Sequence, residues 1–283
     1  MGICFPVSAQ IRADRLRAEV EFLSDSLCAG RESGTPGSSA AAFFVFGRFR
    51  DRGLSPEVDC FRLPDSGAGH NVIGRVSSSA SSRWIIITAY YDGLGTIGGR
   101  IYPGADSNAS GVAALLELAD TLGSVHGPRR NLLFVALDAH NRSRAGADAL
   151  WSYLSSRRIT AGSIDLVVNL DIIGNNLNPV ERCWKDYLIA LGASRRASSL
   201  EACNSGLGLH LYYDYYGSRS FTDLFYRKAG DQKVFLDHGV PCVMFTAGIS
   251  GHTNKTSDTP ETLNYGLLER RVRLIARWIA GMI

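Results

Sequence analysis

Four mostly apolar runs constrain the fold of this chain more than any other feature. They are rich in β-branched residues, as strands buried on both faces of a sheet must be, and they lie at 84–89, 131–137, 164–173 and 242–246. Helical patterns lie around them, at 11–27, from Ser38 or Ser39 to about Arg52, and at 112–122, 145–155 and 267–283. Strands that alternate with helices in this way predict a three-layer α/β sandwich with a largely parallel central sheet.

Composition narrows the class of protein. The 283 residues are 45% hydrophobic and 20% charged, which is ordinary for a globular protein and excludes a disordered chain. The formal net charge is +3 and the arginines are scattered along the sequence, so no nucleic-acid footprint is predicted. No apolar stretch approaches the ~18 residues of a membrane span, and no signal peptide is visible. Without a linker or repeat, we expect one domain over residues 1–283.

Polar residues follow the apolar runs. Tyr90 and Asp92 come after the first run, the segment 138–141 after the second, Asp171 lies near the end of the third, and the loop 247–258 follows the fourth. The carboxyl ends of parallel strands meet at one edge of a sheet, where such folds place their binding sites. The sequence therefore predicts a functional site at this edge.

These strand ends resemble those of the co-catalytic zinc aminopeptidases, an exopeptidase family that includes relatives of glutaminyl cyclases (peptidase family M28). The resemblance rests on AYYDGLG (89–95), PGADSNASGVAALLELA (103–119), FVALDAHNRSRAG (134–146), NLDIIG (169–174), HTNKTSDTPETLN (252–264) and the opening GRESGTPG (30–37). It implies a mixed, mostly parallel sheet between helices, with two zinc ions over the strand ends. It also implies an exported protein, periplasmic or extracellular.

Three acidic positions of the family's site are retained, as the resemblance implies. Asp106 matches the carboxylate that bridges both zinc ions, and Asp171 matches a second carboxylate ligand. Asp92 matches the residue that orients a ligand histidine through a hydrogen bond.

Three other positions are changed. Tyr90 stands at a ligand histidine, His140 at the glutamate that acts as general base, and Asn141 at a ligand glutamate. A neutral phenol with a pKa near ~10 is a poor zinc ligand, and an amide oxygen suits hard cations better than zinc. A histidine in place of the carboxylate base also removes negative charge from the site.

The last ligand is ambiguous. The family places a histidine four residues before an Asp-Thr pair, here Asp258-Thr259, and that spacing selects Asn254. His252 lies two residues earlier and reaches the same place only if the loop bulges.

The sequence thus predicts a metallo-aminopeptidase-like protein that has lost zinc binding and peptidase activity, and that binds a peptide or protein. No cofactor is predicted. The alternative is an active zinc-dependent aminopeptidase with an altered metal site, formed by Asp106 and Asp171 with His252, or with His140 around a single ion. A third interpretation is hydrolysis without zinc that uses His140.

Without metal, the retained carboxylates need other partners. We expect His140 or the Tyr90 hydroxyl to hydrogen-bond Asp106 or Asp171, because a buried carboxylate without a partner is costly. Plainer roles remain open: Asp106 as a helix cap, Asp171 as an acceptor for loop amides, and His252 as an ordinary loop residue.

Overall fold

The computed structural model describes residues 11–63, 67–125 and 127–283. Eight strands of the described chain form one sheet, in the order β1-β2-β6-β3-β7-β10-β8-β9. They are β1 (Glu57–Arg62), β2 (Ala68–Val76), β3 (Trp84–Tyr90), β6 (Asn131–Leu137), β7 (Ile164–Leu170), β8 (Tyr187–Leu191), β9 (His210–Tyr213) and β10 (Cys242–Thr246). The short strands β4 (Thr96–Ile97) and β5 (Arg100–Ile101) form a separate hairpin.

The sheet is mixed and mostly parallel, as the sequence predicts. The central pairs β6·β3, β3·β7 and β7·β10 are parallel, and so is β8·β9 at one edge. The pairs β1·β2, β2·β6 and β10·β8 are antiparallel.

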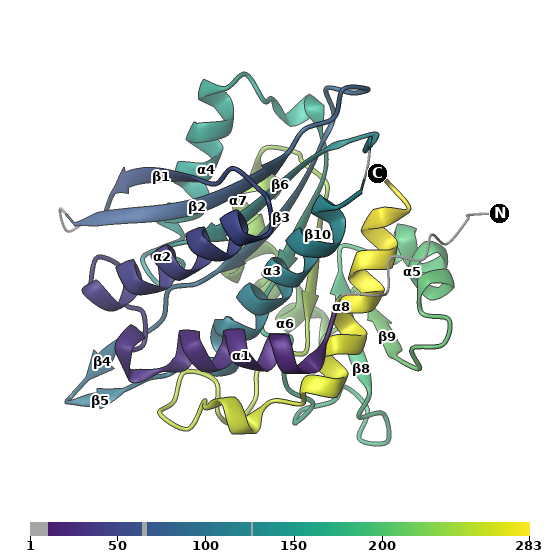
Figure 1. The fold of residues 1–283 in the computed structure, drawn as a ribbon. Coiled ribbons are helices and arrows are strands. Elements are labelled where there is room, and N and C mark those ends of the chain that lie inside the picture. Colours follow the sequence, from purple (N-terminus) through teal and green to yellow (C-terminus); the bar gives the residue numbers. More distant parts are fainter. Residues whose placement is uncertain (1–10, 64–66, 126) are drawn as a thin grey trace.

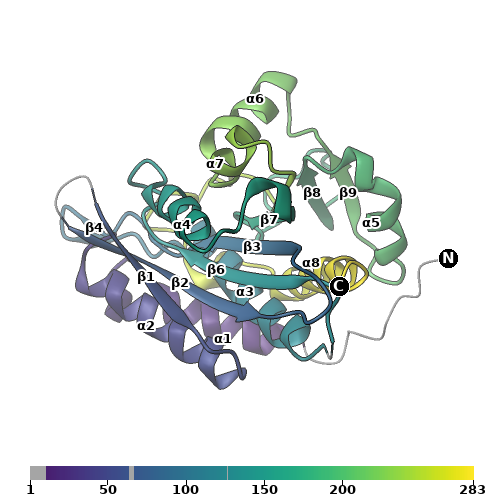
Figure 2. The same ribbon diagram turned by 90° about the horizontal axis from the view of Figure 1, so that it is seen from above.

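Helices cover both faces of the sheet (Figures 1 and 2). One face carries α1 (Ala13–Ser24), α2 (Pro36–Asp51), α3 (Ser110–Gly123) and α8 (Tyr265–Ala280), and the other carries α4 (Ala145–Ser156) and α7 (Gln232–Asp237). Two further helices are α5 (Ala197–Cys203), beside α8, and α6 (Arg219–Leu224). Within the described residues, no helix combines the length and apolar character needed to cross a bilayer.

Alternation along β3 builds the two halves of the core. Ile85 and Ile87 pack with the cluster under α1, α3 and α8, whereas Ile86 and Tyr90 pack with the cluster under α4 and α7. Because successive side chains of a strand point to opposite faces, Tyr90 is placed on the α7 side of the sheet. This placement decides which residues can surround it.

The predicted strands 131–137 and 242–246 are confirmed at both ends. The second helix, however, is capped by Thr35 instead of Ser38 or Ser39 and begins at Pro36, because the Thr35 side chain accepts the Ser38 N–H and proline needs no partner at the first helical position. The third run leaves the sheet after Leu170, since the Ile172 N–H bonds to the Asn108 side chain instead.

Arg31 ties together the loops at the carboxyl ends of the strands. Its side chain is fully buried, and its Nε donates to the Tyr91 carbonyl at 2.7 Å. Its Nη1 donates to the carbonyls of Leu23 and Pro103, and its Nη2 to that of Gly104 at 2.8 Å. The loop that leads to Asp106 is therefore fixed to α1 and to the end of β3.

Gly30 makes this junction sterically feasible. Its φ is +73°, and a Cβ at this position would lie 2.4 Å from the Gly95 carbonyl oxygen. Only glycine adopts this conformation and permits this approach without strain.

We predict that Arg31→Lys lowers the free energy of unfolding by about 3 kcal/mol or more. One ammonium group cannot replace a guanidinium that serves four carbonyls, and buried acceptors would lose their donors. Urea unfolding followed by circular dichroism measures the loss. Arg50→Lys, on an exposed side chain of α2, is the control, and an equal loss in both variants would contradict this role of Arg31.

Candidate functional site

Five of the predicted site residues lie at the carboxyl ends of β3, β6 and β7, as expected: Tyr90, Asp92, His140, Asn141 and Asp171. Tyr90 is the last residue of β3, and its ring stacks on His140 with ring centroids 3.9 Å apart and planes 10° apart. The Tyr90 hydroxyl lies 3.2 Å from the Ser107 Oγ. Burial raises the pKa of Tyr90 well above its usual value, so this phenol is uncharged.

His140 pairs with Asp231, which the sequence did not suggest. Its Nδ1 lies 3.0 Å from the Asp231 Oδ2, and the Asp231 side chain is 1% exposed. Burial alone would lower the pKa of His140, but the charge and hydrogen bond of Asp231, with help from Asp171 and Asp92, raise it to about 9. Position 140 therefore holds an imidazolium cation near neutral pH.

Asp92 anchors the segment that carries His140. Its carboxylate accepts the N–H groups of His140, at 2.8 Å, and Asn141, at 3.0 Å. It also accepts the Asn141 side-chain amide at 3.1 Å, which turns that amide toward Asp92. Burial raises the pKa of Asp92 to about 6, while the positive charge of His140 and these hydrogen bonds lower it.

Both oxygens of Asp106 are bound by protein donors. Its Oδ1 accepts the Gly174 N–H at 2.7 Å and the Ser110 hydroxyl at 3.0 Å, and its Oδ2 accepts the Asn175 amide. Burial nevertheless raises the pKa of Asp106 above its usual value. A Cβ at position 174 would lie 2.8 Å from the Asp106 Oδ1, so Gly174 allows the close approach.

Asp171 lies near the aromatic pair. Burial raises its pKa to about 6, against the positive charge of His140 and the nearby Tyr90 hydroxyl. The expected bond between Tyr90 and a retained carboxylate stays a prediction, since the contact made by the Tyr90 hydroxyl is to the Ser107 Oγ. The same expectation is wrong for His140, whose ring nitrogen selects Asp231 from the neighbouring α7 segment.

Two plainer roles also need correction. Asp106 does not cap α3, since the residue at the cap is Ala109 and its side chain makes no cap bond; Asp106 joins loops instead. Asp171 faces Tyr90 rather than loop amides.

The last of the sequence blocks that resemble the family, 252–264, contains one buried carboxylate, that of Asp258. Its oxygens accept the N–H groups of Asp106, at 2.8 Å, and Ser107, at 3.1 Å. Burial and the charge of Asp106 raise the pKa of Asp258 to about 6. His252 bonds within its own loop, with Nδ1 3.0 Å from the Ser257 Oγ, and Asn254 is exposed with φ +59°.

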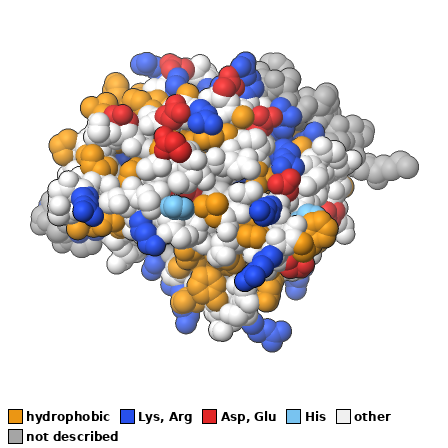
Figure 3. Space-filling model, turned by 90° about the horizontal axis from the view of Figure 1, so that it is seen from below, with side chains coloured by type: hydrophobic (Ala, Val, Ile, Leu, Met, Phe, Trp, Pro, Cys, Tyr) orange, Lys and Arg blue, Asp and Glu red, His pale blue; other side chains and the backbone are white. Residues whose placement is uncertain are grey.

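The residues do not fit a zinc pair. In the part of the chain that the structure describes, no three His, Cys, Asp or Glu side chains gather as a metal site requires. Asp106, the predicted bridging ligand, accepts protein donors on both oxygens, and the pKa of His140 is raised to about 9. On the face of the molecule seen in Figure 3, acidic and basic side chains are interspersed with hydrophobic ones.

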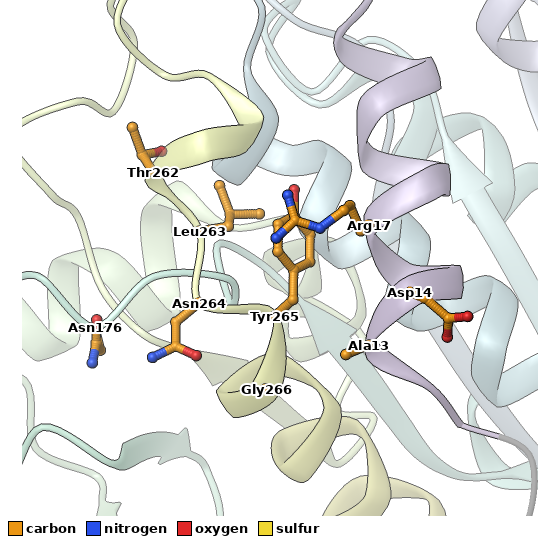
Figure 4. A pocket seen from close by; sticks show the side chains of 9 residues that line it. All are labelled: Ala13, Asp14, Arg17, Asn176, Thr262, Leu263, Asn264, Tyr265 and Gly266. Atoms are coloured by element: carbon orange, nitrogen blue, oxygen red, sulfur yellow. The ribbon is translucent and has the colours of Figure 1, made fainter.

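A cavity of about 610 Å³ lies apart from these residues, between α1 and the start of α8 (Figure 4). There the Arg17 guanidinium lies 4.2 Å from the centroid of the Tyr265 ring. None of the predicted site residues lines it.

The strand order and the polar strand ends define an α/β protein of the zinc-aminopeptidase type. The family model described as peptidase family M28 matches residues 71–279. The chain belongs to peptidase family M28.

Two individual relatives match part of this chain. Nicalin of Caenorhabditis elegans is 31% identical over 132 residues, which cover 40% of this chain and 23% of that protein. The alkaline phosphatase isozyme conversion protein of Escherichia coli is 26% identical over 203 residues, covering 62% of this chain and 58% of that protein. This chain thus spans less than two thirds of either relative.

A solved structure shares the fold. The zinc aminopeptidase BSAP from Bacillus subtilis superimposes with a TM-score of 0.77 at 14% identity, covering 95% of this chain and 94% of that one.

We predict that the stability advantage of the wild-type chain over His140→Gln is pH-dependent. The folded pKa of about 9 exceeds the ordinary 6.5, so the folded state holds this proton more tightly. The advantage is complete below pH 6.5 and disappears as the pH rises through 9. Chemical unfolding at a series of pH values measures it.

The control for this measurement is His238→Gln. His238 stacks on Trp151, and no carboxylate partner is found for its ring among the described residues. A pH dependence that both variants share would not come from the ion pair between His140 and Asp231. A difference between wild type and His140→Gln that does not change between pH 6 and pH 9 would refute the buried ion pair.

Proposed function

We propose that this chain has the M28 fold without the zinc pair or the peptidase activity, and that it binds a peptide or protein at the strand ends. The observation that carries the proposal is the state of Asp106. The residue at the position of the bridging ligand accepts three protein donors, from Gly174, Ser110 and Asn175. A carboxylate that bridges two ions uses both oxygens, and Oδ1 already accepts two donors, so bridging would require one of these bonds to break.

The neighbouring positions support the same proposal. Tyr90 is an uncharged phenol, and the Asn141 amide is bound to Asp92. His140 carries a proton where the family's general base must accept one from water. Each change removes either a metal ligand or the base, and together they leave a site neutralised by hydrogen bonds.

A binding role requires that the edge of the sheet stay ordered without metal. Arg31, Asp258 and Asp92 hold its loops through bonds to backbone groups. These contacts are internal to the chain, so the surface they support does not depend on an ion. The loops after β3 and β10 then form a fixed surface for a partner.

The first prediction from this proposal concerns zinc. After incubation with zinc and dialysis, the protein should retain far less than two zinc ions per chain, because Tyr90 and Asn141 replace ligands. Elemental analysis by plasma mass spectrometry gives the ratio. Two ions per chain that Asp106→Ala removes would favour the alternative, an active aminopeptidase with an altered site.

The second prediction concerns catalysis. Aminoacyl-anilide hydrolysis should stay at background with added zinc, cobalt or manganese. Loss of the general base alone reduces such rates by about 10²–10⁴-fold, and loss of the metal adds to this. Turnover that persists after stringent purification and disappears in Asp106→Ala would contradict the proposal.

The third prediction tests the collapsed site directly. His140→Glu should lower the melting temperature at neutral pH, because it replaces a cation with a carboxylate beside Asp231, Asp171 and Asp92. Part of the loss should return under acid, and part should return in the double variant His140→Glu/Asp231→Asn. His140→Glu should not bring zinc-dependent turnover. A rise in stability on this substitution would contradict a metal-free site.

A further inference from the structure

A second polar cavity lies at the opposite end of the sheet from the candidate site. It has a volume of about 460 Å³ and opens at the amino-terminal starts of β3 and β7, beside the turn before α5 and the end of α8. Because β3 has seven residues, the two ends of the sheet lie about 20 Å apart. The charged residues that line the cavity are Arg129, Arg130, Arg196 and Asp165.

The fold concentrates positive charge here. Asp165 is the only acidic side chain among the lining residues, and both Arg83 and Arg130 pair with it. Arg129 and Arg196 form no ion pair within the described residues. Three lining guanidinium groups against one carboxylate give the cavity a local charge of +2. Arginines that are scattered in the sequence are thus gathered around one hollow.

Two of these arginines are held in place. Arg130 donates its Nε to the Asp165 Oδ2 at 2.5 Å and its Nη1 to the Arg129 carbonyl at 3.0 Å. Arg83 donates its Nε to the other Asp165 oxygen at 2.7 Å and bonds the Gly162 carbonyl. Asp165 is thereby occupied from both sides. Arg130, one of the three lining arginines, is thus oriented before an anion enters and loses less conformational entropy on binding.

We propose that this cavity binds a phosphate-bearing ligand, either a free polyphosphate or the phosphate of a lipid headgroup, through Arg129, Arg130 and Arg196. The planar guanidinium group donates two parallel N–H bonds to the oxygens of a phosphate, and several such groups favour a multiply charged anion over a single carboxylate.

The uncharged part of the cavity fits such a ligand. Ile85, Leu166 and Met282 line it alongside the arginines. A phosphate alone would fill little of this volume, so an organic group attached to the phosphate has apolar surface to contact. This site is separate from the peptidase-like edge of the sheet and does not depend on the function proposed for it.

The test uses the full chain and two kinds of probe. Pyrophosphate and inorganic phosphate are titrated by calorimetry, and phosphatidylcholine vesicles with and without phosphatidic acid are used in flotation. We expect saturable binding of at least one phosphate probe. The double variant Arg129→Gln/Arg196→Gln should bind about tenfold more weakly or worse, since two charged donors are removed. Its melting temperature should stay near that of the wild type, because neither residue forms an ion pair in the described chain.

The matched control is Arg182→Gln/Arg195→Gln, which removes the same charge from exposed arginines that do not line the cavity. It should change affinity by less than about twofold, because such charges are screened by salt. Binding of pyrophosphate alone supports a free phosphate ligand, and binding of phosphatidic acid vesicles alone supports a lipid headgroup. No binding of any probe at about 10 mM, or an equal loss in the control, would overturn the proposal.

Discussion

The guanidinium of Arg31 lies where α1, the end of β3 and the loop before Asp106 meet. It is fully buried and bonds carbonyl groups of all three segments. Asp258 plays the opposite role as an acceptor: its buried carboxylate accepts the N–H groups of Asp106 and Ser107. A buried charge is tolerated only when polar partners surround it, so each of these groups fixes the backbone that satisfies it. The geometry of the candidate site depends on these two residues.

The same requirement applies to the carboxylates of the candidate site. Six carboxylates lie buried at this edge of the sheet, on Asp92, Asp106, Asp138, Asp171, Asp231 and Asp258. Zinc ions would offset part of such charge in an aminopeptidase. In this chain the carboxylates are contacted by backbone amides, by the side-chain amides of Asn175 and Asn141, and by the imidazole of His140. The raised pKa values of Asp92, Asp171 and Asp258, each about 6, indicate that burial outweighs these partners. All three favour the folded state more as the pH falls from about 6 toward 4, the same direction as His140.

Local sequence patterns predicted many of the strands and helices of this structure. The strands at 131–137 and 242–246 have the predicted ends because apolar, β-branched runs buried on both faces leave few alternatives. The short elements β8, β9, α5, α6 and α7 lack a long repeating pattern, and the sequence did not predict most of them. That omission matters, because α7 is preceded by Asp231.

The sequence by itself determined which residue types stand at the strand ends, and its resemblance to the family predicts that Tyr90, His140 and Asn141 stand at positions of metal ligands and base. It could not determine their partners. Asp231 lies 91 residues from His140, and Asn175 lies 69 residues from Asp106. The gathering of Arg129, Arg130 and Arg196 around one cavity is likewise absent from the order of the residues. Tertiary structure decided these pairs, because hydrogen bonds and charges act over a few ångströms in space, whatever the separation along the chain.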